Sequence, residues 1–298
     1  MFMNYEQGTI SLECIKEALV DPSRTTTKAT ELGFVWTPGD ALLTFATSEE
    51  FVRDASTRPN VAAILVDAGV TLSENLPEGG PELFFVQNVR LNFFRLHNSL
   101  RSKMKFAPTR ISPSATVHPT AVIDEVGVII GDNCIVEPGV SIRPGTTIGN
   151  NCVIRAGAHL GTDALDIKDD EDGNPMMTDH LGGVVLGDHV EIGHNAIVDR
   201  SIFRQTHTLV DDYTKVGCLS MVSHGVRIGK RNKVTAGVMI CGSTVVGDDN
   251  WFGPGAIVSN LLKLGSRNYV ALGANVLSDL EDEWKVVGTR VFRDRKLF

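Results

Sequence analysis

The chain has 298 residues and carries 36 acidic against 28 basic side chains, so its formal net charge is −8 at neutral pH. A general nucleic-acid binder needs a basic face, so this balance argues against that class and leaves room for a small phosphorylated ligand. No apolar run approaches the length of about 18 residues that a membrane span needs. The first residues show no basic region followed by an apolar core, so we expect no secretory signal.

Residues 1–106 alternate short apolar segments, at 62–67 and 82–87, with a helical pattern at 89–105. We expect a small N-terminal α/β domain here. A linker follows at 106–114, where Pro108 and Pro113 interrupt regular structure. The sequence predicts a second domain over 107–282 and a short C-terminal tail over 283–298.

A strict six-residue repeat begins after this linker. Stepping by six from Leu186 to Val276 gives sixteen positions, fifteen of them apolar, with Arg204 as the one polar breach. A small residue mostly stands four places after each of them, and glycine often comes directly after. An earlier tract runs in its own phase from Ile130 to Leu160, and a shorter one precedes it.

A period of six fits neither an α-helix nor an alternating strand. It indicates a triangular coil of three hexads, about 18 residues, whose branched residues point inward while small residues let the chain turn each corner. Successive coils then pair as parallel strands about 4.8 Å apart. The sequence therefore predicts a mainly β fold, a parallel β-helix with hexapeptide repeats.

Two breaks interrupt the period. One residue is added between Ile123 and Ile130, and the spacing between Leu160 and Leu186 is not a multiple of six. The second break contains an acidic, turn-rich segment at 166–181. An insertion that leaves a solenoid lies on its surface, where it is either a solvated loop or part of the binding face. Both alternatives stay open.

His224 is the histidine whose position suits catalysis. It lies third in the hexad that starts at Val222, outside the inward sites, and Gly242 should stack beside it one coil later. A histidine accepts a proton from an attacking amine or hydroxyl near neutral pH. The N–H of a glycine stabilises the oxyanion that forms. The alternative is that His224 is an ordinary surface residue.

The cysteines suggest a second chemistry. Cys134 and Cys152 fall on stacked small sites, where core packing explains them, while Cys218 and Cys241 lie nearer His224 and raise an acyl-cysteine route. No basic partner to activate either one is evident in the sequence. The total of five, with Cys14 and without a CxxC pair, favours a reducing cytoplasm.

A metal site is a further alternative. His189 and His194 form an H-x4-H spacing, which invites the zinc site of β-helix carbonic anhydrases. That family places its pair at the third position of one hexad and the second of the next. His194 fits the first, but the second falls on Asp199. We therefore expect no metal and no permanently bound cofactor.

Several segments resemble the UDP-3-O-acylglucosamine N-acyltransferase family of lipid A biosynthesis and related nucleotide-amino-sugar N-acyltransferases. They are VLGDHVEIG at 185–193, the Asp199–Arg200 pair, VSHG at 222–225 and TAGVMICGS at 235–243. Residues 43–51 and 88–95 are similar to the start and end of the family's nucleotide-binding domain. The resemblance implies a left-handed coil and a homotrimer, with sites in the crevices between adjacent β-helices.

The resemblance also implies roles for individual residues. His224 falls on the family's catalytic histidine, and Gly242 falls on the glycine whose N–H faces the reacting carbonyl. Phe45 and Phe51 fall where aromatic rings hold the uracil base, although plain core packing explains them equally well.

Other positions depart from the family pattern. GTDALD at 161–166 replaces Gly-Phe-Gly-Tyr, Leu261 replaces a second histidine, and Ser48 replaces an asparagine at the base contact. An aspartate that precedes the catalytic histidine falls on Gly217, so the residue that orients His224 is unidentified. The chain also ends at Phe298 without the long helical segment that grips acyl carrier protein. These departures favour another amino-sugar nucleotide and a short acyl group from coenzyme A.

We therefore expect an enzyme, an N-acyltransferase that moves an acyl group directly from a thioester, in preference acyl-CoA, to the amine of a nucleotide-linked amino sugar. The nearest alternative is the lipid A enzyme with acyl carrier protein as donor. A zinc hydratase and a non-catalytic scaffold are more distant. Four basic residues late in the chain are candidates for contacting the phosphates of the donor, and the alternative is that they are ordinary solvated charges. They are Lys230, Arg231, Arg290 and Arg293.

Overall fold

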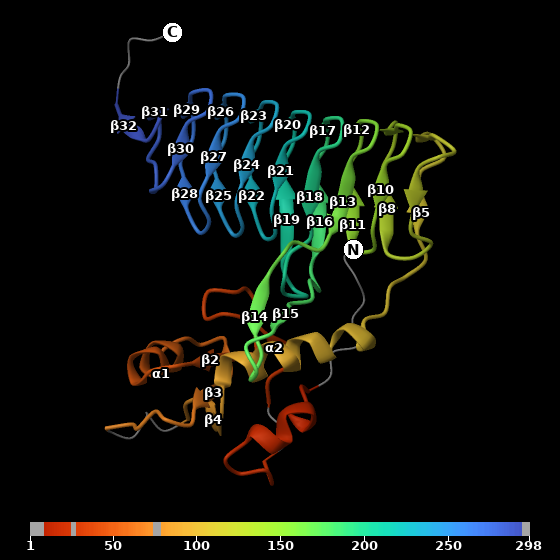
Figure 1. Cartoon of the computed structure of the whole chain (residues 1–298). Coiled ribbons are helices and arrows are strands. Elements are labelled where there is room, and N and C mark those ends of the chain that lie inside the picture. The colour runs from red at the N-terminus through yellow and green to blue at the C-terminus, as the bar shows by residue number, and fades with distance from the viewer. Residues whose placement is uncertain (1–8, 25–27, 74–78, 294–298) are drawn as a thin grey trace.

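The computed structural model describes residues 9–24, 28–73 and 79–293. A long solenoid of parallel strands runs across the top of Figure 1, and a smaller N-terminal unit lies beneath it. The hairpin of β14 (Ile167–Asp169) and β15 (Pro175–Met177) leaves the solenoid and reaches the helix α2 (Val89–Ser99) of that unit. The described residues contain no helix that is long and apolar enough to cross a bilayer.

The N-terminal unit is a four-stranded parallel sheet in the order β1-β2-β3-β4. Ser48 caps α1, because its Oγ accepts a hydrogen bond from the Phe51 N–H at 3.3 Å. The α/β character that the sequence predicts is present. Its strands are β1 (Glu31–Leu32), β2 (Leu42–Ala46), β3 (Val61–Asp67) and β4 (Glu82–Val86), and its helices are η1 (Glu13–Ala18), α1 (Glu49–Ser56), α2 (Val89–Ser99) and η2 (Arg101–Lys103).

The solenoid has three faces, each a sheet of mainly parallel strands, and we number the faces in the order in which the chain visits them. Face 1 contains β5 (Arg110–Ile111), β8 (Val128–Ile130), β11 (Thr146–Ile148), β16 (Gly183–Leu186), β19 (His207–Val210), β22 (Arg227–Ile228), β25 (Val245–Val246) and β28 (Lys263–Leu264). Face 2 contains β6 (Thr116–Val117), β9 (Ile135–Val136), β12 (Val153–Ile154), β17 (Glu191–Ile192), β20 (Lys215–Val216), β23 (Lys233–Val234), β26 (Trp251–Phe252), β29 (Tyr269–Val270), β31 (Lys285–Val287) and β32 (Arg290–Phe292). Face 3 contains β7 (Val122–Ile123), β10 (Ser141–Ile142), β13 (His159–Thr162), β18 (Ile197–Asp199), β21 (Met221–Val222), β24 (Met239–Ile240), β27 (Ile257–Val258) and β30 (Asn275–Val276).

The repeat positions form one continuous apolar core along the coil axis, from Val128 to Val286. The branched residue of each hexad points inward, and the small residue four places later is also buried. Burial of these side chains is the main force that holds the coils together. The predicted left-handed parallel β-helix with hexapeptide repeats is confirmed. β31 continues face 2 past residue 282, where the sequence analysis begins the tail, and β32 folds back on it antiparallel.

Two insertions leave the coil at the same corner, where the chain passes from face 3 to face 1 (the 3–1 edge). Most stacked residues are 18 positions apart, as Asp132 and Asn150 are. Asn150 and Asp188 are 38 apart, because residues 163–182 leave the coil there (insertion 163–182). Asp188 and Asp212 are 24 apart, because residues 200–206 form a second loop (loop 200–206).

This second loop corrects the sequence analysis on Arg204. That residue occupies no hexad position, because Leu186 pairs directly with Val210. Arg204 lies in loop 200–206 and donates a hydrogen bond to the Thr30 carbonyl at 3.2 Å. The loop adds six residues to this coil, which is the length of one hexad, so the six-residue phase continues unchanged after it. In the sequence, the inserted loop therefore looks like a hexad with one polar residue at its apolar position.

Both insertions dock the N-terminal unit onto the 3–1 edge. Ile202 and Phe203 of loop 200–206 are buried in the core of the N-terminal unit, where the Phe203 ring lies 4.9 Å from Phe34. Glu171 of insertion 163–182 pairs with Arg95 on α2. The N–H of Leu181 also donates to the Ile202 carbonyl at 2.8 Å, so the insertions brace each other.

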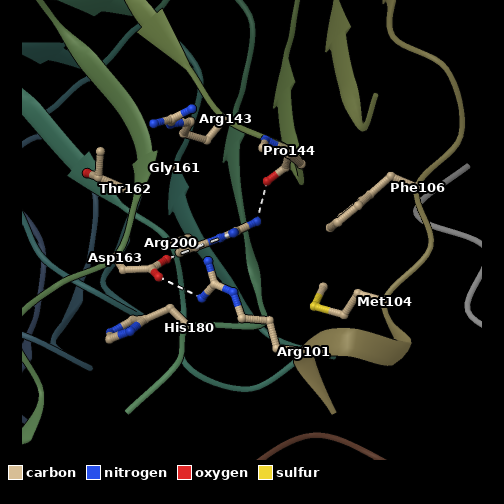
Figure 2. A pocket seen from close by; sticks show the side chains of 10 residues that line it. All are labelled: Arg101, Met104, Phe106, Arg143, Pro144, Gly161, Thr162, Asp163, His180 and Arg200. Carbon is tan, nitrogen blue, oxygen red and sulfur yellow. Dashed lines mark hydrogen bonds and ion pairs between the residues drawn. The ribbon is translucent and has the colours of Figure 1, made fainter. Parts of the chain in front are cut away.

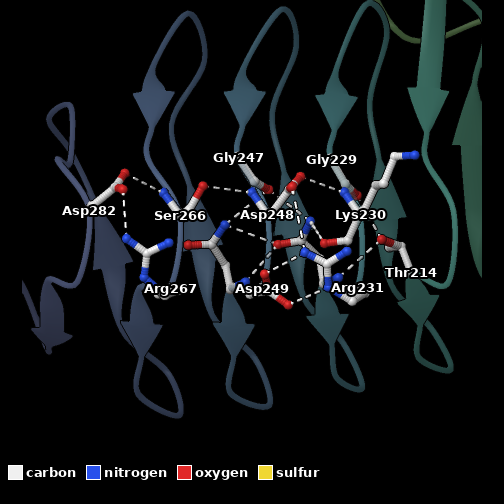
Figure 3. Close-up of polar contacts among 12 residues, drawn as sticks. Thr214, Gly229, Lys230, Arg231, Gly247, Asp248, Asp249, Ser266, Arg267 and Asp282 are labelled. Atoms are coloured by element: carbon white, nitrogen blue, oxygen red, sulfur yellow. Dashed lines mark hydrogen bonds and ion pairs between the residues drawn. The ribbon is translucent and has the colours of Figure 1, made fainter.

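A polar ladder runs along a different corner, between face 1 and face 2 (the 1–2 edge, Figure 3). Asp248 accepts from the Lys230 N–H at 2.8 Å, Ser266 accepts from the Asp248 N–H, and Asp282 accepts from the Ser266 N–H. These bonds satisfy backbone donors that the strand pairing leaves free at the turns. The ladder therefore explains the charged residues of this edge as structural.

We predict that Phe203→Ala lowers the free energy of unfolding by about 3 kcal/mol, because it removes a buried ring from the shared core. Hydrogen exchange measured by mass spectrometry should then accelerate in β2 and α2. Phe252→Ala is the matched control, since this ring is fully buried within the solenoid. It should lower stability while α2 stays protected, and equal exchange in both variants would contradict the docking role of Phe203.

Candidate active site

His224 and Gly242 occupy the 3–1 edge on successive coils. Val222 and Ile240 pair directly on face 3, and the Ser243 N–H donates to the His224 carbonyl at 2.8 Å. The His224 side chain is half-buried and points away from the solenoid core. The stacked arrangement expected from their spacing of one coil is therefore present.

The imidazole of His224 lies against the face of Gly242. A Cβ atom at Gly242 would lie 2.4 Å from both Cε1 and Nε2 of the ring. Other glycines of the repeat, such as Gly217 and Gly253, are constrained by the backbone of the next coil. Gly242 differs because the obstacle is the histidine side chain, so the absence of a side chain at this position is what admits the ring.

A cavity of about 650 Å³ contains this pair, and it lies between the solenoid edge and the N-terminal unit. Phe45 and Phe51 line the same cavity. Phe45 also packs 4.9 Å from Phe93 in the core, whereas Phe51 is 59% exposed on α1. The structure thus brings together four residues that the sequence analysis selected from three separate segments.

Insertion 163–182 contributes to the cavity wall. Asp166 and Lys168 line the cavity and form an ion pair with each other. The Lys168 ammonium also lies 4.5 Å from the centre of the Phe94 ring, which fixes the insertion against α2. The insertion is therefore packed against the cavity and α2 and is not simply a solvated loop.

Burial dominates the acid–base behaviour of His224. It lowers the pKa of the imidazole below its ordinary value, while Asp166 raises this pKa and Lys168 lowers it. Burial disfavours the charged imidazolium, so the ring is neutral near pH 7 and has a lone pair available for a proton. This protonation state suits a general base.

Four further predicted residues lie outside this cavity. Lys230 and Arg231 are on the 1–2 edge, where Lys230 pairs with Asp212 at 2.8 Å and Arg231 pairs with Asp249 at 2.7 Å. Arg290 and Arg293 are exposed at the far end of the solenoid. The structure does not bring these cations to His224 within one chain.

The alternative chemistries find little support in the geometry. Burial raises the pKa of the Cys241 thiol, although this residue lines the cavity, so it is not an activated thiolate. His189 stacks on Tyr213 at the 1–2 edge, and His194 lies at the corner between face 2 and face 3. These two histidines therefore do not converge on one metal.

Sequence reasoning did not select two residues beside His224. His180, at the end of insertion 163–182, packs its ring 5.5 Å from the His224 ring. Arg90 lines the cavity from the first turn of α2. Nothing in the repeat pattern marks either one, because both reach the site only through the docking of the N-terminal unit and the insertion.

Comparisons with known proteins agree with this architecture. Residues 127–162 match the model of the bacterial transferase hexapeptide (six repeats). The chain is 34% identical over 114 residues to UDP-3-O-acylglucosamine N-acyltransferase 1 of Francisella tularensis, across 38% of this chain and 30% of that protein.

Longer matches are weaker in identity. The chain is 29% identical over 237 residues to the UDP-3-O-acylglucosamine N-acyltransferase of Coxiella burnetii, across 70% of this chain and 66% of that protein. The matched region thus spans less than two thirds of these relatives. A solved structure, the UDP-N-acetylglucosamine acyltransferase from Campylobacter jejuni, is similar with a TM-score of 0.49 and 21% identity, across 59% of this chain and 73% of that one. The predicted resemblance to hexapeptide-repeat acyltransferases is confirmed.

We predict that Gly242→Ala is destabilising because its methyl group meets the His224 ring. In a double-mutant cycle, thermal unfolding should show that Gly242→Ala lowers the free energy of unfolding by about 1–3 kcal/mol when His224 is present. In the His224→Ala background the same change should have a clearly smaller effect, since the obstacle is gone. Equal effects in the two backgrounds would show that the ring does not stack on Gly242.

The pKa of His224 should respond with opposite signs to its two charged neighbours. NMR titration should give a lower pKa in Asp166→Asn, where a stabilising negative charge is lost, and a higher pKa in Lys168→Met, where a repelling positive charge is lost. The signal is assigned by its absence in His224→Ala. If the pKa of His224 moved in the same direction in both variants, Asp166 and Lys168 would not act on His224 as the structure indicates.

Proposed function

We propose that this protein is an N-acyltransferase that moves an acyl group from a thioester directly to the amine of a nucleotide-linked amino sugar. The observation that carries the proposal is the neutral His224 ring lying on Gly242 in a cavity that Phe45 and Phe51 also line. A base, a candidate oxyanion donor and an aromatic platform thus line one cavity.

The proposed step follows from these positions. As the amine attacks the thioester carbonyl, Nε2 of His224 takes one of its protons. The carbonyl oxygen gains negative charge and accepts a hydrogen bond from the Gly242 N–H, which makes no other hydrogen bond within the described chain. When the C–S bond breaks, the imidazolium of His224 returns the proton to the sulfur, so the base is regenerated.

The nucleotide is proposed to bind between α1 and insertion 163–182. The exposed ring of Phe51 offers a stacking surface for a base, with Phe45 deeper in the cavity. Arg90 supplies positive charge on the cavity wall for the phosphates of the acceptor. With its nucleotide held in this way, the acceptor would direct its sugar amine toward His224.

Face 3 supports the proposal of a homotrimer. Its outward side carries a row of exposed apolar residues that includes Met239 at 39% and Ile257 at 42% exposure. A second copy of the chain is the occupant that we propose for this row. Since face 3 ends at the 3–1 edge, each cavity then borders a neighbouring subunit, as the predicted crevice sites require.

For the acyl donor we propose acyl-CoA, with acyl carrier protein as the second candidate. The second candidate follows from the resemblance to the lipid A enzyme, and the relatives that the chain matches are named UDP-3-O-acylglucosamine N-acyltransferases. We also propose that the reaction takes place in the cytoplasm, since all five cysteines are free thiols.

The test compares His224→Ala with the unaltered protein on a panel of UDP- and dTDP-linked amino sugars, each with short acyl-CoA, long acyl-CoA or acylated carrier protein. We expect kcat to fall by about 10²-fold or more in the variant, because the proton acceptor is lost. His118→Ala, an exposed histidine far from the cavity, is the control and should keep full activity. Undiminished turnover in His224→Ala would remove His224 from the mechanism, and turnover with carrier protein alone would select the second donor.

A further inference from the structure

His180 is fully buried and His224 is half-buried, and each imidazole leaves one buried nitrogen without a partner among the described residues. The His180 side chain has no exposed surface, and its Nδ1 bonds the Thr178 carbonyl at 3.1 Å. Within the described chain, His180 Nε2 and His224 Nδ1 are both buried and make no hydrogen bond. The two rings are 5.5 Å apart between centres, with an angle of 69° between their planes.

The bonding of His180 determines its tautomer. A carbonyl oxygen only accepts, so Nδ1 of His180 carries the proton and donates it to Thr178. Nε2 of His180 is therefore an acceptor with a free lone pair. Burial lowers the pKa of His180 to about 4, so this acceptor persists at neutral pH.

His224 has the complementary requirement. A base that works beside Gly242 needs its lone pair on Nε2, the nitrogen nearest that glycine. The single proton of the neutral ring then sits on Nδ1, which is buried and needs an acceptor.

We propose that His180 is the positioning residue of His224: its Nε2 accepts the Nδ1 proton of His224, directly or through one bridging water. This inference rests on the proposed function, and it identifies the orienting partner that the sequence left open. The hydrogen bond holds the ring in one tautomer and keeps the Nε2 lone pair turned toward the cavity.

The charged groups around the two rings are already paired. Asp163 accepts from Arg101 at 2.8 Å, and Asp166 forms its ion pair with Lys168. These are the charges that influence His180 and His224. A neutral histidine is therefore the acceptor that remains for Nδ1.

Insertion 163–182 holds His180 rigidly enough for this role. Figure 2 shows His180 beside Asp163, with the Arg200 guanidinium reaching across to the Pro144 carbonyl. Arg200 also donates to the Gly182 carbonyl at 3.1 Å, so it ties the end of the insertion to the solenoid. His180 is thus held by the coil as well as by α2.

The direct test is nitrogen NMR of histidine-labelled protein without substrate, which reports the tautomer of His224 independently of activity. The His224 signals, assigned by their loss in His224→Ala, should show the proton on Nδ1. His180→Leu should shift the population toward the Nε2-protonated form, whereas His180→Gln, which retains an acceptor oxygen, should resemble the unaltered protein. An unchanged tautomer in His180→Leu would overturn the proposal.

Kinetics with the best acceptor and donor provide the second arm. His180→Leu should lower kcat by about tenfold or more with little change in KM, and should move the acidic limb of the pH profile, while His180→Gln restores most of the rate. His97→Leu is the control. His97 lies on α2, is almost as fully buried as His180 and contacts the Asp179 carbonyl of the insertion, but it does not line the cavity. An equal loss in His97→Leu would show general loosening and overturn the role of His180. If the unaltered protein acylates no amino-sugar nucleotide, the proposed function fails, and the NMR arm still decides the role of His180.

Discussion

Parallel pairing between successive coils is the constraint on which the rest of the structure depends. The strands of each coil pair with those of the coils on either side, so side chains one coil apart are held in ladders. Extra residues cannot enter this pairing without breaking it, and they must leave at a corner. Both long insertions leave at the 3–1 edge, and the same ladder places His224 directly beside Gly242.

The concentration of features on one edge produces the site. Insertion 163–182 and loop 200–206 leave adjacent coils, and His224 follows on the next coil at the same corner. The two insertions fasten the N-terminal unit there through buried Phe203 and the contacts with α2. The aromatic residues of that unit therefore share a cavity with a base supplied by the solenoid. The charged ladder of the 1–2 edge has a different role, because its side chains bond the backbone and one another.

Much of this could be predicted from the sequence, because the solenoid repeats one local rule. The period of six was enough for the core, the coil spacing and the stacking of His224 on Gly242. The same period hid loop 200–206, since an insertion of one hexad preserves the phase and looks like one substitution at Arg204. It gave no sign of His180, whose position depends on how insertion 163–182 folds back. Likewise, the meeting of Phe51 with His224 is a tertiary contact between distant segments that no spacing encodes.

The central claim is that the 3–1 edge and the docked N-terminal unit form one acceptor site around His224. A crystal structure of the protein with a UDP-linked amino sugar tests it most directly. The claim predicts the base against Phe51 and Phe45, and the sugar amine about 3 Å from Nε2 of His224, within hydrogen-bond reach. A nucleotide sugar bound at another edge, or an amine turned away from His224 in this cavity, would contradict it.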